Sequence, residues 1–418
     1  MTKYNVIDSI MGSGKSSYCI QYVNEAPDDE RFIYIALYND EVKRFKDGVT
    51  NRVMHEPTTT ESDGRKLTSL KRMIEAGLDI VTTHALLSLA DSETIELLRQ
   101  HNYHLIVDEV LDVIQEIPEM KKQDIDILKN KANIIETDNL GNVKWLDESI
   151  GAESMYSKLY YTAKAGTLFI SKKETFSVRL YNRRVLESFE TVTVCSYLFK
   201  YSQLCAYYRM FDVNYDIKSV KYDWRIGKYT LCKYDPLTED RNALYELMDI
   251  YEGKYNDNLK GQRLSAKALR CLENETEVGK DVFDTIARNI RGFFRMQESH
   301  KVGDVYWATL KDVSNSIGAR RSMRDFKSDS FKISINAKAT NKYKDALAIA
   351  YVYDIYQNVT HKQFFEGHSV AINEDGWSVS EILQLIYRSR IRDGEKVSLY
   401  IPSARMRRIL NEWANYEL

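Results

Sequence analysis

The sequence is poor in several features that would assign it to a special class of protein. Its five cysteines are odd in number and form no Cys-x-x-Cys pair, which argues against a disulfide framework and against a structural zinc site. No stretch of about eighteen apolar residues and no signal-peptide pattern occurs, so we expect no membrane span and a cytoplasmic location. The 5 prolines and 18 glycines form no low-complexity linker and no repeat of fixed period.

The chain also lacks a strong charge of either sign. Its 59 Lys and Arg residues are offset by 61 Asp and Glu residues, for a formal net charge of −2. This balance excludes a globally basic coat for nucleic acid but leaves local basic grooves possible. At 418 residues, with 44% hydrophobic residues, the chain is long enough to form two or three globular domains.

The most informative feature lies near the N-terminus, in the stretch NVIDSIMGSGKSSYCIQYVNE. An apolar run ending at Val6 and Ile7 predicts a buried strand, and the residues after the glycines predict a helix. Glycines at such a junction let backbone N–H groups face phosphate oxygens at the helix N-terminus. The predicted phosphate-binding residues are Gly12, Ser13, Gly14, Lys15, Ser16 and Ser17.

Within this loop, Lys15 is expected to reach the β- and γ-phosphates of ATP, and the Ser16 hydroxyl is expected to bind Mg²⁺. Ser9 stands where such a loop usually has glycine, so the entry turn must suit a residue with a side chain. The alternative is a glycine turn before an unrelated helix. The loop alone indicates an NTPase and covers kinases, transporters, motors and helicases.

A second motif, YHLIVDEVLDVI, narrows that range. Its apolar run before Asp108 and Glu109 is typical of a buried parallel strand that ends in two carboxylates where ligands bind in α/β sheets. Asp108 is expected to hold Mg²⁺ through water, and Glu109 to polarise the attacking water. A small nucleotide kinase has less need of such a water-activating carboxylate. The alternative is a solvated acidic strand end.

Two further segments suggest contacts with ligands. GLDIVTTHALLSLA predicts a strand ending near Thr83 and His84, where polar groups suit the phosphates of a nucleic-acid backbone. The alternative is an ordinary end of a strand in an α/β fold with no role in binding. In the C-terminal part, the spacing of Ser378 and Glu381 predicts a capping box, and Gly394 is placed to end the helix.

Within that predicted helix three polar side chains recur at intervals of four residues, which places them on one face. They are Gln384, Arg388 and Arg392. The residues that supply its apolar side are Val379, Ile382, Leu383, Ile386 and Tyr387. A solvated basic face is the alternative.

Taken in order, several segments resemble the DEAD-like helicases and ATPases of superfamily 2 that tailed bacteriophages encode. The segments are MGSGKS, YNDEVKRF, TTHALL, LIVDEV, CSYLF, YWATLKD, NAKATNKY and QLIYRSRIRDG with LYIPSARMR, and they span residues 4 to about 413. In that family two RecA-like domains face each other, ATP binds in the cleft, and the motif matched by Gln384 lines the cleft from the second domain.

The resemblance implies further roles by position. Thr83 and His84 match a nucleic-acid-contacting motif, and Cys195-Ser196 matches a motif that couples hydrolysis to strand movement. The corresponding motif of the second domain is matched by Asn336, Thr340 and Asn341. Departures from the family pattern are the tetrad Asp-Glu-Val-Leu, the arginine spacing after Gln384, and the absence of room for an adenine-reading motif before the loop.

We therefore predict an α/β fold with two RecA-like P-loop domains, parallel sheets and inserted helical elements. Residues 1–205 form the N-terminal ATP-binding domain, elaborated at about 112–190, and residues 206–418 form the C-terminal helicase domain, with a helical insert at about 238–300.

The predicted function is that of an ATP-dependent translocase or helicase, a nucleic-acid-stimulated ATPase that uses ATP and Mg²⁺. Its expected partner is single-stranded or forked nucleic acid, DNA rather than RNA, in phage replication, recombination or repair, alongside phage replication proteins. The catalytic residues are Lys15, Glu109, Gln384, Arg388 and Arg392, with Arg392 as the arginine finger, and the metal ligands are Ser16 and Asp108. A DNA-packaging motor and a nucleotide-dependent binding switch are the alternatives.

Overall fold

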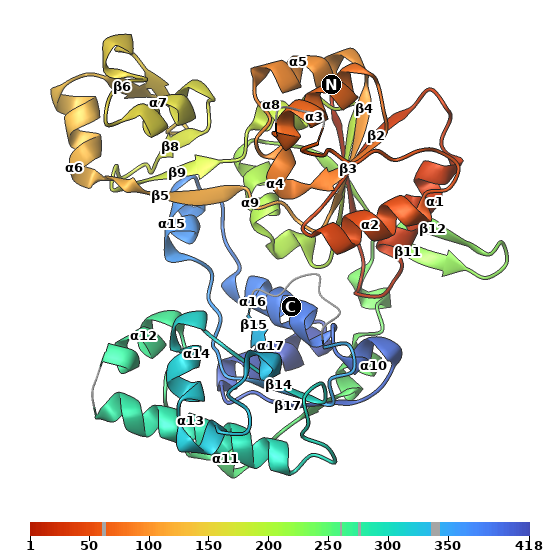
Figure 1. Ribbon diagram of the computed structural model, residues 1–418, viewed down its shortest axis with the longest axis vertical. Coiled ribbons are helices and arrows are strands. Elements are labelled where there is room, and N and C mark those ends of the chain that lie inside the picture. Colours follow the sequence, from red (N-terminus) through yellow and green to blue (C-terminus); the bar gives the residue numbers. More distant parts are fainter. Residues whose placement is uncertain (61–63, 260, 275–276, 336–342) are drawn as a thin grey trace. The chain divides into compact units, whose positions relative to one another are not determined.

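The computed structural model describes residues 1–60, 64–259, 261–274, 277–335 and 343–418. The chain divides into two compact units (Figure 1). The N-terminal unit comprises Met1–Tyr234 and Asn358–Ile372, and the C-terminal unit comprises Asp235–Gln357 and Asn373–Leu418. The chain therefore passes between the units three times.

The N-terminal unit is built on a seven-stranded sheet with the order β12-β11-β1-β10-β4-β2-β3. All neighbouring strands are parallel except the antiparallel pair β11 and β12. The central strands are almost wholly buried, as expected for a parallel sheet covered on both faces. The strands are β1 (Lys3–Asp8), β2 (Arg31–Ala36), β3 (Ile80–Thr83), β4 (Tyr103–Asp108), β10 (Thr191–Ser196), β11 (Tyr215–Asp223) and β12 (Lys228–Lys233).

Helices cover both faces of this sheet because successive strand residues point to opposite sides. Ile7 and Ile106 pack with α1 and α2 in one apolar cluster, whereas Val6 and Val107 pack with α3, α5 and α9 in another. The helices are α1 (Lys15–Glu25), α2 (Asn39–Gly48), α3 (Lys66–Glu75), α4 (His84–Leu87), α5 (Ser92–Gln100), α8 (Arg183–Leu186) and α9 (Gln203–Met210).

The segment between β4 and β10 forms a separate elaboration with its own small core around Met120, Leu128 and Trp145. It combines the three-stranded sheet β5-β9-β8 with the two-stranded sheet β6-β7. The elements are β5 (Ile114–Lys121), α6 (Lys122–Ile125), a π-helix (Asp126–Lys131), β6 (Ile135–Thr137), β7 (Val143–Trp145), α7 (Ser157–Lys164), β8 (Leu168–Ile170) and β9 (Phe176–Leu180).

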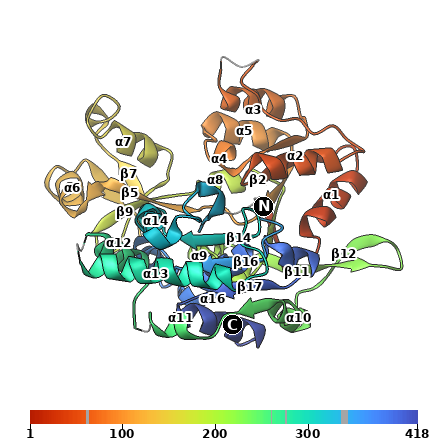
Figure 2. The same ribbon diagram turned by 60° about the horizontal axis from the view of Figure 1, so that its bottom comes forward.

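The C-terminal unit has a five-stranded parallel sheet with the order β13-β17-β16-β14-β15. Figure 2 labels three of its strands, β14, β16 and β17. Its strands are β13 (Met248–Ile250), β14 (Val305–Thr309), β15 (Lys332–Ser334), β16 (Ala348–Tyr351) and β17 (Val397–Tyr400). Its helices are α10 (Arg241–Glu246), α11 (Lys254–Asp257), α12 (Ala266–Asn274), α13 (Val278–Arg295), α14 (Lys311–Gly318), α16 (Glu374–Ile386) and α17 (Ala404–Ala414). Within the described residues, no helix is long and apolar enough to cross a membrane.

The boundary between the units differs from the one predicted at residue 205. β11 pairs with β1, and β12 with β11, so the N-terminal unit continues to Tyr234. Helix α15 (Val359–Gly367) also belongs to this unit, because Phe364 and Phe365 are buried in its core. A side-chain contact of 3.1 Å between Gln203 Nε2 and His361 Nδ1 joins α15 to α9.

Candidate nucleotide-binding and catalytic site

The loop predicted to bind phosphate joins β1 to α1, and its entry is fixed by buried hydrogen bonds. The Asp8 carboxylate accepts hydrogen bonds from the backbone N–H groups of Leu198 (2.9 Å) and Phe199 (2.8 Å). Ser9, which replaces the usual glycine, accepts a hydrogen bond from the Val220 N–H at 2.8 Å. Ser9 has no positive φ, so the entry turn uses its hydroxyl and has no need of glycine.

The two loop glycines occupy backbone conformations that favour glycine. Gly12 has φ 79° and Gly14 has φ 94°, both in the left-handed region. Gly14 is the N-cap of α1, and no side chain caps the helix there, so its first N–H groups are available to an anion. The Lys15 Nζ donates hydrogen bonds to the carbonyls of Ser9 (2.6 Å) and Ile10 (3.2 Å) and curls over the loop.

Tyr229 of β12 lies against this loop from outside. A Cβ atom on Gly14 would stand 2.0 Å from Tyr229 Cε1, so the ring occupies the space of a side chain at that position. The backbone of Tyr229 is held from both sides by the Gln21 amide of α1, with distances of 2.9 Å and 3.1 Å. Sequence patterns did not predict the contact between Gly14 and Tyr229, because these residues lie far apart in the chain.

Ser16 and Asp108, the two predicted Mg²⁺ ligands, lie together at the carboxyl edge of the sheet. The Ser16 hydroxyl donates a hydrogen bond to Asp108 Oδ2 at 3.0 Å. The Tyr34 hydroxyl donates to the same oxygen at 2.6 Å, and burial together with the Asp108 charge raises the pKa of Tyr34 well above its ordinary value. A hydroxyl beside a carboxylate is the oxygen donor set that Mg²⁺ prefers, so these residues fit the ion.

Glu109 follows Asp108 with an unusual backbone conformation. Its φ is 67°, in the left-handed region that a residue with a side chain seldom occupies. The Glu109 N–H donates a 3.0 Å hydrogen bond to the Cys195 carbonyl, which ties the end of β4 to the neighbouring strand β10. Strained backbone of this kind is concentrated at functional sites. No sequence pattern predicted it.

Cys195 itself is packed inside the unit. Its Sγ lies 3.2 Å from the Sγ of Cys19 on α1, and both thiols are free. This contact and burial raise the pKa of Cys195 well above its usual value, so the thiol stays protonated. Ser196 is also buried. The matched coupling motif therefore touches the helix that follows the phosphate loop.

The prediction that His84 contacts nucleic acid conflicts with its position. His84 begins α4 with only 8% of its surface exposed, and burial lowers its pKa to about 4 although Asp108 and Asp112 oppose the shift. The ring is therefore a neutral group beneath Asp108, because an imidazolium would lose its hydration there. Thr83 is half-buried, and its hydroxyl accepts from the Leu86 N–H at 3.4 Å as the cap of α4.

The predicted helix from Ser378 to Gly394 is wrong at both ends. Helix α16 begins at Glu374 with Asn373 as its cap, and Ser378 is a buried interior residue. The helix ends at Ile386 because Ser389 interrupts it, its hydroxyl donating to the Ile386 carbonyl at 2.7 Å.

The three predicted polar residues therefore do not share one helix face. Gln384 lies in α16, Arg388 lies in the turn after it, and Arg392 is exposed in the 3-10 helix Arg390–Asp393. Gln384 Oε1 and Arg388 Nε are buried without a hydrogen-bond partner in the described part of the chain. Arg390 forms an ion pair with Glu395. Gly394 ends the 3-10 helix with φ 79°.

The remaining predicted contacts of the second domain, Asn336, Thr340 and Asn341, lie outside the described residues.

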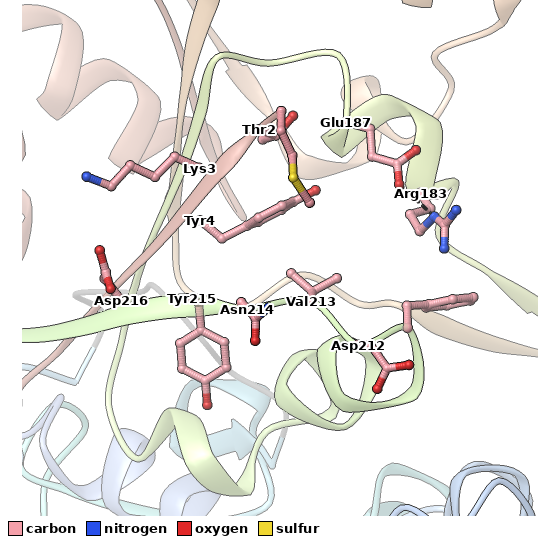
Figure 3. A pocket seen from close by; sticks show the side chains of 12 residues that line it. Thr2, Lys3, Tyr4, Arg183, Glu187, Asp212, Val213, Asn214, Tyr215 and Asp216 are labelled. Atoms are coloured by element: carbon pink, nitrogen blue, oxygen red, sulfur yellow. Dashed lines mark ion pairs between the residues drawn. The ribbon is translucent and has the colours of Figure 1, made fainter.

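A cavity of about 570 Å³ lies in the N-terminal unit, away from the phosphate loop. It is lined by the start of β1, including Tyr4, and by the start of β11, including Tyr215 (Figure 3). The ion pair between Arg183 and Glu187, at 2.7 Å, lies at its wall. The amino ends of parallel strands form the opposite edge of the sheet from the loop, so this cavity is separate from the predicted phosphate loop.

Comparison with known proteins gives the relationship of the whole chain. It is 31% identical over 424 residues to the SPbeta prophage-derived uncharacterized protein YonV of Bacillus subtilis (strain 168), with 99% of each chain covered. The chain belongs to the YonV family. Residues 242–414 match the YonV C-terminal Rossmann-like domain, a stretch that includes α15 of the N-terminal unit.

Solved structures were compared with the fold of this chain. The structure described as XPD_APO has a TM-score of 0.50 and 10% identity, covering 98% of this chain and 95% of that chain. The structure of S. tokodaii Xpd4 has a TM-score of 0.47 and 10% identity, covering 100% and 94%. This chain is a mixed α/β protein with parallel sheets and shares the fold of the XPD_APO structure, which confirms the predicted fold class.

Proposed function

We infer that this chain is an ATP-dependent nucleic-acid translocase or helicase that acts on DNA. The observation that carries the inference is the convergence of three groups at one edge of the N-terminal sheet. These are the glycine loop before α1, the bonded pair of Ser16 and Asp108, and the strained Glu109. An ATP-hydrolysing site needs a phosphate cradle, metal ligands and a group that positions water.

The residues of the loop have distinct roles in this proposal. The backbone N–H groups of Gly12–Ser17 hold the phosphates, and Lys15 exchanges its two carbonyl partners for the β- and γ-phosphate oxygens. Mg²⁺, held by Ser16 and Asp108, would offset the negative charge of the phosphates. Tyr34 remains a hydrogen-bond donor to Asp108 and fixes the orientation of the carboxylate.

Glu109 is the proposed acceptor for the proton of the attacking water. Its left-handed backbone turns the chain directly after Asp108, so that two adjacent residues take different roles, one toward metal and one toward water. The backbone bond from Glu109 to Cys195 joins this turn to the matched coupling motif. A shift of Glu109 in response to the γ-phosphate would thereby move Cys195 in β10.

The C-terminal unit would supply Gln384, Arg388 and Arg392 to catalysis. Gln384 Oε1 and Arg388 Nε are buried without a hydrogen-bond partner among the described residues, and a bound ligand would supply the missing partner. An arginine that stabilises the γ-phosphate in the transition state is the usual contribution of a second unit in such enzymes. We assign that role to Arg392 or Arg388.

The proposed partner is single-stranded or forked DNA, and the proposed setting is phage replication, recombination or repair. The YonV relative is named as prophage-derived, which supports a phage setting for this chain. Phage replication proteins would then be its further partners. The RecA-like fold supports movement along a strand, because paired units of this fold can alternate their grip with each ATP.

Strand displacement on a forked duplex tests the proposal. Purified protein should hydrolyse ATP faster with single-stranded DNA than without it, and should release the displaced strand only with ATP and Mg²⁺. The Glu109→Gln variant is the matched control, since it keeps the nucleotide contacts and loses the proton acceptor. A protein with no ATPase under any of these conditions would overturn the proposal.

A nucleotide-dependent binding switch is the second candidate. It is favoured by the tetrad Asp-Glu-Val-Leu, which lacks the histidine or aspartate that relays to the coupling motif in the helicases that the sequence resembles. ATP hydrolysis without displacement of either strand, together with ATP-dependent retention on DNA, would favour the switch over the helicase.

A further inference from the structure

The hairpin of β11 and β12 presents an exposed tryptophan at its tip. Trp224 is 86% exposed and Ile226 is 58% exposed, and Figures 1 and 2 both show the hairpin reaching away from the N-terminal sheet. The tip is nevertheless ordered by bonds from Asp223, whose carboxylate accepts from the Arg225 N–H at 2.9 Å and whose carbonyl accepts from the Gly227 N–H at 2.9 Å. A solvent-facing indole leaves most of a large flat apolar surface uncovered.

The same hairpin is locally basic. Residues 215–233 contain five Lys or Arg residues and two Asp residues, a formal charge of +3 in a chain whose formal net charge is −2. Lys228 forms an ion pair with Glu25 at 2.8 Å. Among the described residues, Lys221 and Arg225 form no ion pair and are exposed. Their charge is therefore available to an anionic partner.

We propose that the tip of the β11–β12 hairpin binds unpaired nucleotides, with Trp224 stacked on a base and with Lys221 and Arg225 next to the phosphates. Aromatic stacking and basic side chains together are the means by which proteins hold single strands without reading their sequence. A duplex hides the faces of its bases, so the site would prefer a single strand. This inference rests on the proposed function and adds to it a strand-binding site outside the matched motifs.

The base of the hairpin is joined to the ATP loop by a row of aromatic rings. Trp224 contacts Tyr222 with ring centroids 4.5 Å apart, and Tyr222 contacts Tyr229 with centroids 5.0 Å apart. Tyr229 in turn lies on Gly14 and is bracketed by Gln21. A strand bound at the tip would therefore act on the position of the phosphate loop, with Tyr222 and Tyr229 as positioning residues.

Anisotropy titration with a labelled oligothymidylate of about 20 nucleotides measures the proposed site directly. Trp224→Ala should weaken binding by between about 5- and 150-fold, the equivalent of losing one stacked base at about 1 to 3 kcal/mol. Trp224→Phe should restore most of the affinity, because its ring still offers a face. Tyr161→Ala is the matched control: Tyr161 is a 60% exposed aromatic residue on α7 of the same unit, and its loss should leave affinity unchanged.

Two further measurements separate stacking from charge and binding from catalysis. The double variant Lys221→Gln and Arg225→Gln should reduce the slope of log K against log salt by about 0.7 for each phosphate that the protein no longer neutralises. Trp224→Ala should raise the DNA concentration needed for half-maximal stimulation of the ATPase, since it removes a contact with the strand at the hairpin tip.

The outcomes are distinct. Wild-type protein that binds the oligothymidylate no more tightly than Trp224→Ala overturns the hairpin site and leaves the proposed helicase function standing. Wild-type protein that neither binds DNA nor responds to it in ATPase assays overturns both. Trp224-dependent binding to vesicles of anionic lipid, with no change in oligonucleotide affinity, would show a membrane contact and also overturn the hairpin site.

Discussion

Lys15, Ser16 and Asp108 of the N-terminal unit each bond to another protein group, whereas Gln384 Oε1 and Arg388 Nε of the C-terminal unit are buried with no hydrogen bond among the described residues. The first set can hold its geometry before a nucleotide binds. In the second set folding removes the hydrogen bonds that these polar atoms make to water and provides no protein partner among the described residues. Each such group lowers the free energy of unfolding by about 1 to 3 kcal/mol.

The two sets of residues would therefore gain different free energies on binding the same ligand. Lys15 must release two carbonyls when it binds phosphate, so its net gain is an exchange of partners. Arg388 gives up no bond at Nε, so any partner that reaches it gives a full gain. Substrate binding should therefore depend mainly on the N-terminal unit, and the rate of the chemical step should depend on both.

The largest effect is expected from Lys15→Ala, which should abolish measurable ATP hydrolysis and weaken ATP binding. Lys15 Nζ contacts two loop carbonyls, so its removal should leave the fold intact. Nucleotide binding by fluorescence, ATPase rate and the circular-dichroism melting curve would be measured together. Lys46→Ala, an exposed lysine on α2, is the control. Turnover of Lys15→Ala at the wild-type rate would mean that the loop is not the catalytic site.

Alanine variants of the three arginines address the other side of the comparison. Arg388→Ala or Arg392→Ala should lower nucleic-acid-stimulated turnover by roughly a thousandfold, with little change in ATP affinity, as for a group that acts in the transition state. Arg390→Ala serves as the control because Glu395 already engages that side chain. Equal mild effects from all three would show a solvated basic segment and would remove the contrast between the units.

Glu109 permits a test in which activity and stability diverge. Glu109→Gln should bind ATP with Mg²⁺ but hydrolyse it on the order of a hundredfold more slowly, or less still. Glu109→Gly should be equally inactive, yet as stable as the wild type or up to about 1 kcal/mol more stable, since glycine adopts a φ of 67° without strain. Stopped-assay turnover and urea unfolding measure the two quantities. Loss of ATP binding in Glu109→Gln would indicate a structural role.

The smallest effect is expected from acid conditions, which act on the stability of the fold through His84. Its pKa falls from 6.5 to about 4 on folding, so between these values the unfolded chain binds more protons than the folded chain. Stability should therefore decrease as pH falls, by about 2 kcal/mol from pH 6.5 to pH 5. His84→Gln should lack this part of the slope in urea unfolding at the two pH values. Identical slopes would show that His84 is not the neutral, buried group described.

Local patterns were sufficient for the elements that carry the loop and the carboxylates. The apolar run before Asp8 and the helix from Lys15 are where the sequence predicts them, and β4 ends at Asp108. These features follow from short-range chemistry, because a buried strand and a glycine turn are encoded by adjacent residues. The fold class could be predicted because strand and helix patterns alternate along the chain.

What the sequence did not predict depends on residues distant in the chain or on competing local bonds. The hydroxyl of Ser389 ends α16 early, although the apolar periodicity continues past it. The burial of His84 beneath Asp108 depends on packing that no motif encodes. Tyr229 on Gly14 and Tyr34 on Asp108 are contacts across the sheet, so only the folded chain brings them together.

The return of α15 to the N-terminal unit means that the chain is not a series of transferable modules. A fragment ending at Tyr234 would lack Phe364 and Phe365 and expose the apolar surface that they cover, whereas a contiguous fragment of residues 235–418 would carry both rings without their core. Neither half could be exchanged between genes by a single crossover without leaving one core incomplete. The path of the chain between the two units therefore favours inheritance of this protein as a whole, whatever its catalytic activity requires.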